Sequence, residues 1–305
     1  MRLAILALAL IVSLQDPRPA DDTFVGIGVW YAGPGAQPPA VNTNDLESLR
    51  RDLLTIRRAG FNAITTWIVW RDAEPQRGAY ALTGIERLIA AAAEADLRVA
   101  IVAYTETPPA WAQPGRDTPA DFVVYLARRL ALQKNVLGVV GTSGPNQPLR
   151  ERIEVTPATA PNARLAMWAA LSAGARSVAF HAQDDPLSSA ILSLGETAGV
   201  VSRNQALFAP LRPRQGGISR LSGDVAGVEV RLLESASALV IIGVNRASAT
   251  RKVTIAFASD MPEAIWQNLE TGTAVNFIMQ KEGPTFEYTF GPHDALVLMI
   301  GKRLR

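Results

Sequence analysis

The sequence predicts an α/β protein with a parallel sheet, followed by an antiparallel β-sandwich. Between residues 24 and 210, apolar strand-like runs alternate with helix-like segments, a βαβα order typical of parallel strands joined by helical crossovers. From Gly216 onward the pattern changes to short period-two strands separated by turns. The chain has 305 residues, of which 48% are hydrophobic and 19% charged, which suits one large or two modest globular domains.

The first part contains six predicted strands and the helices between them. Residues 45–59 place Leu46, Leu49, Leu53 and Ile56 on one helical face, and Asn44 is the predicted N-cap. Strands are predicted at 24–31, 63–70, 99–104, 136–141, 152–156 and 176–182, and helices at 45–59, 84–95, 120–133 and 162–173, with a further helical region to about residue 210.

The second part is predicted to be a β-sandwich domain over residues 214–305. A turn is expected at 269–272, where Gly272 follows a polar run. Strands are predicted at 228–233, 238–245, 252–257, 263–268, 285–290 and 295–300.

Residues 60–80 are the part of the first domain most informative about function. An apolar strand is followed by Arg71, Asp72 and Glu74, at the carboxyl end where parallel α/β folds build their sites. The alternative is that Glu74 and Pro75 only brace the loop.

The motifs around this strand resemble glycoside hydrolases of the β-galactosidase kind, families 42 and 35 and their relatives, over residues 24–111. They are an aspartate-bearing helix (Asp52), a Gly-x-Asn step (60–62), Trp70, the Glu-Pro-x-x-Gly-x-Tyr turn (74–80), a third strand (97–104) and the Pro-Pro-x-Trp ending of a threonine-rich loop (105–111). The resemblance implies a (β/α)8 (TIM) barrel over residues 22–213. Six strands in roughly 190 residues, against about 250 for a full barrel, predict a barrel shortened by about two βα units, with strands five and six missing or reduced.

The resemblance also implies a retaining glycosidase with two catalytic carboxyl groups. Glu154 lies where the family has its nucleophile, near the end of strand seven; the alternative is an ordinary surface glutamate. The family's acid/base glutamate follows an asparagine at the end of strand four, and residues 139–144 contain no carboxylate. Glu106, at the end of strand three, is the candidate to replace it.

Further side chains at predicted strand ends are candidates for binding sugar. Aromatic rings stack on sugar faces, although core packing is the alternative for each of them. His181 is a candidate contact or a structural histidine, and Asp184 and Asp185 bind hydroxyls or cap the helix after Pro186. The predicted substrate-binding residues are Trp30, Trp70, Glu74, Tyr104, Trp111, His181 and Asp184.

Several function classes are not indicated. The chain has no cysteine, and its two histidines, His181 and His293, fall in different predicted domains, so neither a metal site nor a cofactor is expected. The sequence contains no Gly-x-Ser-x-Gly elbow and no phosphate loop. The net charge is +2 and basic residues are scattered, which argues against nucleic acid as a partner.

The first residues predict export. Arg2 precedes an apolar run over residues 3–14, which is too short to span a bilayer comfortably and typical of a signal peptide covering residues 1–21. A secreted or periplasmic protein without a membrane span is expected, the alternative being an uncleaved anchor. The predicted function is a glycoside hydrolase-like protein that cleaves or binds extracellular oligosaccharide or polysaccharide. The alternatives are a non-catalytic binding relative and an envelope structural protein.

Overall fold

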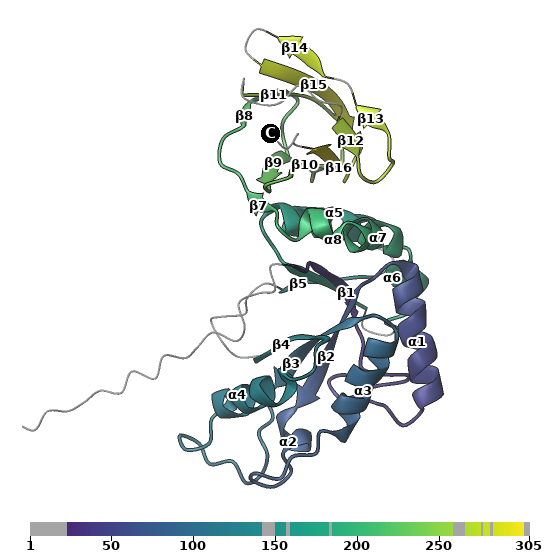
Figure 1. Cartoon of the computed structure of the whole chain (residues 1–305), viewed down its shortest axis with the longest axis vertical. Helices are drawn as coiled ribbons and strands as arrows, with labels where there is room; N and C mark the ends of the chain where they lie inside the picture. The colour runs from purple at the N-terminus through teal and green to yellow at the C-terminus, as the bar shows by residue number, and fades with distance from the viewer. Residues whose placement is uncertain are drawn as a thin grey trace, which may run out of the picture.

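The computed structural model describes residues 23–141, 150–156, 159–182, 185–258, 266–275, 277–280 and 283–301. They form one parallel sheet, flanking helices and two antiparallel sheets, stacked along the long axis of the molecule (Figure 1). Among these residues no helix has the length and apolar character needed to cross a membrane.

The parallel sheet has six strands in the order β4-β3-β2-β1-β6-β5. This confirms the predicted parallel sheet with helical crossovers. The prediction for residues 63–70 is wrong at its end, because Trp70 begins the short helix α2 and the strand stops at Val69. The strands are β1 (Gly26–Trp30), β2 (Ala63–Val69), β3 (Arg98–Tyr104), β4 (Val136–Gly141), β5 (Arg150–Glu154) and β6 (Ser177–His181).

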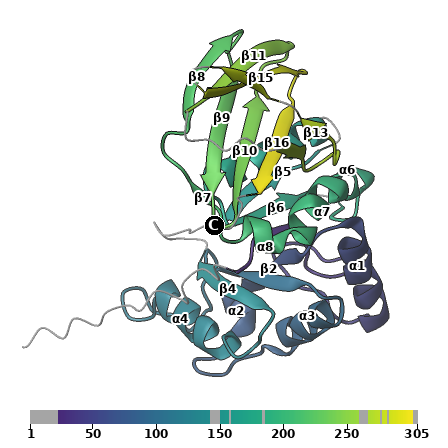
Figure 2. The ribbon, with the colours of Figure 1, turned by 45° about the horizontal axis from the view of Figure 1, so that its top comes forward.

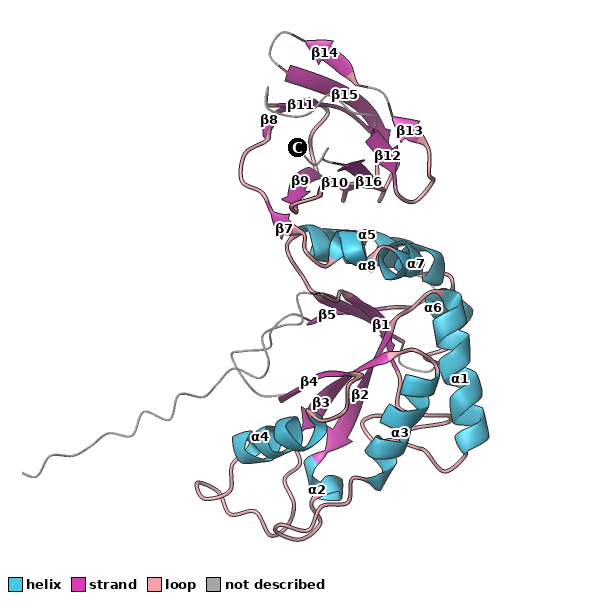
Figure 3. Ribbon diagram, in the orientation of Figure 1, coloured by secondary structure: helices cyan, strands magenta, loops and turns pink. Residues whose placement is uncertain are grey.

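The helices pack on one face of the curved sheet, where their buried side chains form a single core with alternate residues of the strands (Figure 3). α1, α3 and α4 cover β1 to β4, whereas α5, α7 and α8 lie between the parallel sheet and the antiparallel sheets. The helices are α1 (Leu46–Ala59), α2 (Trp70–Ala73), α3 (Thr83–Glu94), α4 (Pro119–Leu130), α5 (Ala160–Ser172), α6 (Ser189–Leu192), α7 (Gly195–Arg203) and α8 (Gln205–Phe208).

The start of α1 differs from the prediction by one residue. Asp45, not Asn44, is the N-cap, because its Oδ1 accepts hydrogen bonds from the backbone N–H groups of Glu47 and Ser48 at 3.1 and 3.0 Å. Leu46, predicted on the buried face, is 39% exposed. The buried stripe of α1 consists of Leu49, Leu53 and Ile56.

Strand alternation sends side chains to two distinct environments. In β1, Ile27 and Val29 belong to the large core beneath the helices, whereas Trp30 belongs to a small separate cluster with Trp67 and Ala179. We call the face that carries this cluster the inner face of the sheet.

The two antiparallel sheets pack face to face around a second core (Figure 2). Their strand orders are β13-β12-β16-β10-β9-β7 and β14-β15-β11-β8, and apolar residues of both form one cluster. This confirms antiparallel sheets after the α/β part. The strands are β7 (Arg212–Pro213), β8 (Ile218–Gly223), β9 (Val228–Glu234), β10 (Ala238–Asn245), β11 (Arg251–Phe257), β12 (Trp266–Asn268), β13 (Ala274–Val275), β14 (Ile278–Gln280), β15 (Gly283–Phe290) and β16 (Ala295–Gly301).

Helix α5 joins the two parts. Val240, Ile242 and Val244 of β10 belong to the same core cluster as the helices and the parallel sheet, so apolar packing continues across the junction. Arg164 of α5 forms ion pairs with Glu270 and with Asp294, the latter at 3.3 Å. The junction is therefore a packed interface closed by charges.

Candidate functional site

Four strands bring polar and aromatic side chains together on the inner face, at their carboxyl ends. Trp30 ends β1, Trp67 lies near the end of β2, and the ring centroids are 4.4 Å apart. His181 ends β6 and lies 5.9 Å from each indole, edge to face. Arg152 and Glu154 come from β5, where Glu154 is in register with His181. The fold thus places two indoles beside a carboxylate, a guanidinium and an imidazole.

Both carboxylate oxygens of Glu154 have partners. Its Oε1 accepts a hydrogen bond from Nε of Arg152 at 2.6 Å, and its Oε2 lies 2.7 Å from Nδ1 of His181. The Arg152 guanidinium also faces the ring of Trp30, with Cζ 5.1 Å from the centroid. Glu154 is therefore fixed at the edge of the site, although its side chain is 59% exposed.

The imidazole of His181 links the two charged side chains. Nη2 of Arg152 lies 3.0 Å from the same Nδ1 that faces Glu154. A ring nitrogen either carries a hydrogen and donates or carries a lone pair and accepts, so one tautomer serves only one neighbour. With Nδ1 protonated the bond goes to Glu154; with Nδ1 unprotonated Arg152 donates to it.

These contacts lower the pKa of Glu154. Burial raises it, but the hydrogen bond and charge of His181 and the adjacent Arg152 guanidinium outweigh that effect. A depressed folded-state pKa contributes stability that is present above the unfolded-state pKa and is lost as the pH falls through the folded-state value. The contacts therefore stabilise the fold only while Glu154 is ionised.

We accordingly expect Glu154→Gln to alter the acid limb of the stability profile. The difference in unfolding free energy between wild type and variant should be constant above pH about 4.5, the ordinary value, and should shrink at lower pH. Urea unfolding at a series of pH values measures it. Arg152→Met should move the loss to higher pH, and parallel profiles for wild type and Glu154→Gln would contradict the assignment.

The structure does not bring Glu106 to Glu154. Glu106 is exposed, and its Oε2 accepts a hydrogen bond from the hydroxyl of Tyr104 at 3.0 Å, which raises the pKa of Tyr104. Strands β2, β1 and β6 separate β3 from β5, and among the described residues no hydrogen bond or ion pair joins the two glutamates. Glu106 and Tyr104 thus form a pair of their own.

Trp70, Glu74 and Trp111 lie in the interior of a loop rather than on the inner face. Glu74 is 5% exposed; its Oε2 accepts from Nε1 of Trp70 at 2.9 Å and its Oε1 from the backbone N–H of Gly78 at 2.8 Å. Nε1 of Trp111 donates to the Glu74 carbonyl at 2.8 Å, and Trp70 stacks on Phe122 of α4. These contacts match a bracing role for the loop after β2.

The aspartates after β6 have different outcomes. Asp184 lies outside the described residues. Asp185 does not cap the following helix: Ser188 is the N-cap of α6, and Oδ1 of Asp185 accepts from the backbone N–H of Leu187 at 2.8 Å. The other carboxylate oxygen of Asp185, Oδ2, has no hydrogen-bond partner among the described residues.

A cavity of about 260 Å³ lies next to the indole pair. Its walls are the loop after β1 (residues 31–36), Trp30, Trp67, His181 and residues 185–187. Asp52 of α1 also lines it, with Oδ2 accepting from the hydroxyl of Tyr31 at 2.8 Å. Burial, together with this bond and charge, raises the pKa of Tyr31.

Of the residues that line this cavity, Asp52 was not predicted to bind sugar. The period of two along β2 carries a signal for Trp67, since residues 63, 65 and 67 share the face of Trp30. No local pattern indicates that Asp52, on a helix, reaches the same cavity.

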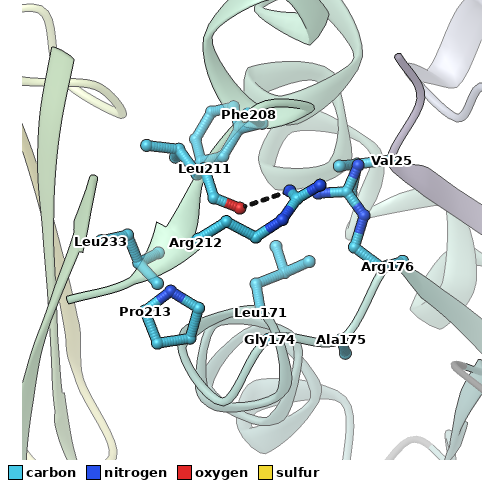
Figure 4. Close-up of a pocket in the computed structure, with 10 residues that line it drawn as sticks. All are labelled: Val25, Leu171, Gly174, Ala175, Arg176, Phe208, Leu211, Arg212, Pro213 and Leu233. Atoms are coloured by element: carbon cyan, nitrogen blue, oxygen red, sulfur yellow. Dashed lines mark hydrogen bonds between the residues drawn. The ribbon is translucent and has the colours of Figure 1, made fainter. Parts of the chain in front are cut away.

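A second cavity, of about 40 Å³, lies between α5, α8 and the start of the antiparallel sheets (Figure 4). Leu171, Phe208 and Leu233 line it together with Arg176 and Arg212, and Nη1 of Arg212 donates to the Leu211 carbonyl at 2.8 Å. Because a liquid water occupies about 30 Å³, this space is too small for a sugar. No group of three or more potential metal ligands occurs among the residues described.

Several solved structures similar to this chain are glycoside hydrolases. A maltogenic α-amylase from Thermotoga neapolitana has a TM-score of 0.60 at 10% identity, covering 93% of this chain and 100% of its own. An Anoxybacillus α-amylase has a TM-score of 0.58 at 11% identity, covering 94% and 100%. A family 39 glycoside hydrolase from Bacteroides cellulosilyticus has a TM-score of 0.53 at 11% identity, covering 92% and 82%. The chain therefore has a glycoside hydrolase-like fold.

Within that class, the sequence resembles one family. Residues 39–116 match the family model described as beta-galactosidase, which confirms the resemblance of the motifs around β2 and β3. The comparison with curated proteins gives no match.

Proposed function

We propose that this chain is a carbohydrate-binding protein with a glycoside hydrolase-like fold that hydrolyses natural glycosides poorly or not at all. The similarity to the β-galactosidase family and the fold support carbohydrate as the ligand. The cavity beside Trp30 and Trp67 supports the inner face as the place of binding, since indole faces suit sugar stacking.

The observation that carries the proposal is the state of Glu154. Retaining hydrolysis needs a nucleophile and an acid about 5–5.5 Å apart across one sugar bond. Both oxygens of Glu154 already have partners, and three strands lie between β5 and β3, the strand that Glu106 follows. The sequence from Val136 to Arg150 contains no carboxylate that would serve as acid.

A retaining glycosidase is the second candidate. The lowered pKa of Glu154 favours it, because a nucleophile must be ionised. Glu154 would then be the nucleophile and Glu106 the acid, which requires a substrate that spans the inner face between β5 and β3.

The architecture we propose follows from the strand order. The order β5-β6-β1-β2-β3-β4 is that of strands 7, 8, 1, 2, 3 and 4 of a (β/α)8 barrel, which supports a barrel lacking counterparts of strands five and six. We propose residues 22–213 as the barrel and 214–305 as the sandwich. Export through a signal peptide at residues 1–21, to the periplasm or medium, is part of the same proposal.

The test compares binding with turnover. Galactosides and other oligosaccharides should raise the melting temperature without being hydrolysed, because losing a general acid costs roughly 10²- to 10⁴-fold for poor leaving groups. Aryl glycosides with acidic phenols need that proton less, so slow release of the phenol, accelerated by azide, is the most we expect. Glu154→Gln should abolish such release and leave sugar binding intact.

Glu106→Gln is the matched control, because it also removes one exposed carboxylate after a strand of the parallel sheet. It should change neither binding nor phenol release. Rapid cleavage of natural disaccharides, lost in Glu106→Gln, would establish the second candidate instead. Absence of any sugar binding would overturn both.

A further inference from the structure

The cavity beside Trp30 has a chemical character that the family resemblance does not specify. Its volume of about 260 Å³ is below the roughly 300–1,000 Å³ of pockets for drug-sized ligands, so it accommodates one sugar ring rather than a chain. Two indoles, 7 and 8% exposed, form one wall. A ring seated there would lie against their remaining exposed surface.

The charged groups that line this cavity are acidic. Asp52 and Asp185 both line it, and each has one oxygen held by the protein and one without a partner among the described residues. The lining contains neither lysine nor arginine. Arg152 faces the ring of Trp30, but it is not part of the lining and its guanidinium is paired with Glu154. The charge near the cavity is therefore negative on balance.

Trp30, which lines the cavity, also carries an unsatisfied hydrogen-bond donor. Nε1 of Trp30 is buried and has no hydrogen-bond partner in the described part of the chain. Indole N–H groups only donate, and leaving one unpaired in the interior costs free energy. Because this nitrogen has almost no accessible surface, a ligand hydroxyl would supply the missing acceptor only if the Trp30 ring shifted.

We propose that the cavity selects a basic sugar unit, a hexosamine with a free ammonium group, over neutral and acidic sugars. The proposal rests on the proposed function and specifies its ligand. Two carboxylates that line one cavity attract an ammonium group by charge and repel a uronate. Ring hydroxyls donate to the same carboxylates, so neutral sugars bind more weakly.

The experiment is calorimetric titration of the full chain with four probes in one buffer, at a pH where the amine is charged. Glucosamine or galactosamine should bind roughly fivefold to tenfold more tightly than glucose or galactose, consistent with a partly exposed ion pair. N-acetylglucosamine, in which the charge is removed, should lose that advantage. Glucuronate should not bind, and added salt should reduce only the preference for the amine.

Asp185→Asn and Asp52→Asn should each reduce the preference while keeping their internal hydrogen bonds, since an amide oxygen also accepts. Asp96→Asn is the matched control, because Asp96 precedes β3 at the opposite end of the sheet. Equal affinity for basic and neutral sugars, or preference for glucuronate, would overturn the inference and leave the proposed function standing. Failure of every sugar to bind would overturn the proposed function itself. Salt dependence with the unaltered protein keeps the test decisive if a variant does not fold.

Discussion

Replacing Trp168 by alanine is expected to destabilise the whole chain by about 3–5 kcal/mol, as truncation of a buried tryptophan does. Trp168 is fully buried in α5, packs near Phe208 of α8 and donates from Nε1 to Glu270 beyond β12 at 3.0 Å. The cavity left behind would lie at the junction of the α/β part and the antiparallel sheets.

The shared core predicts how the protein unfolds as well as how much stability it loses. Because α5 packs on β5 and β6 and also on β9, β10 and β16, both parts should unfold in one transition. Far-ultraviolet circular dichroism and hydrogen exchange of β10 in urea measure this. Leu132→Ala, at an 81% exposed position, should change stability by less than about 0.5 kcal/mol. Two separate transitions, of which Trp168→Ala shifts only one, would contradict a common core.

The α/β part could be predicted from sequence because its strands carry few polar side chains. The runs at residues 99–104 and 136–141 are continuous and apolar, and β3 and β4 occupy nearly these positions. The end of β2 was predicted one residue too late, because an apolar residue such as Trp70 fits the end of a strand as well as the start of a helix. What decides it is the buried contact of Trp70 with Phe122 and Glu74.

In the second part, long strands were predictable and short ones were not. β10 matches its predicted residues 238–245, whereas β7 and β13 have two residues each, too few to show a period. The continuous apolar run of β10 fits a strand covered on both faces, but only the tertiary fold shows that α5 covers one of them.

Some residues of the site could be named from the local sequence, whereas others are brought there only by the tertiary fold. Trp30 and His181 were named because they lie near the ends of predicted strands, and Glu154 because the resemblance puts the family's nucleophile there. The structure brings these three together. The role of Arg152 could not be predicted without knowing which residues of β5 and β6 lie side by side. That Asp52 lines the cavity could not be predicted without knowing how α1 packs against the loop after β1. Only the tertiary fold reveals how many groups hold Glu154.

Helix α7 packs on β1, and its first residue meets the end of α1 with the two backbones in close contact. Gly195 begins α7 where it meets the end of α1, and a Cβ atom there would lie 2.1 Å from the carbonyl oxygen of Ala59. Gly60, which follows α1, meets the start of α7 equally closely. A Cβ atom added to Gly60 would lie 2.2 Å from the Gly195 carbonyl oxygen. Neither backbone has room to move without separating the two helices.

Gly195→Ala should therefore destabilise the protein by about 3 kcal/mol, the upper part of the usual range for overpacking. Gly84→Ala is the matched control: its Cβ would meet only Thr43 Oγ1 at 3.6 Å in the first turn of α3, so stability should be unchanged or raised by up to about 1 kcal/mol. Chemical denaturation of both variants measures the effect. Because α7 packs directly on β1, which carries Trp30, the displaced helix should also weaken sugar binding in Gly195→Ala. Wild-type stability in that variant would mean that α1 and α7 do not pack backbone to backbone. Lost stability with intact binding would mean that the inner face keeps its geometry without the helices behind it.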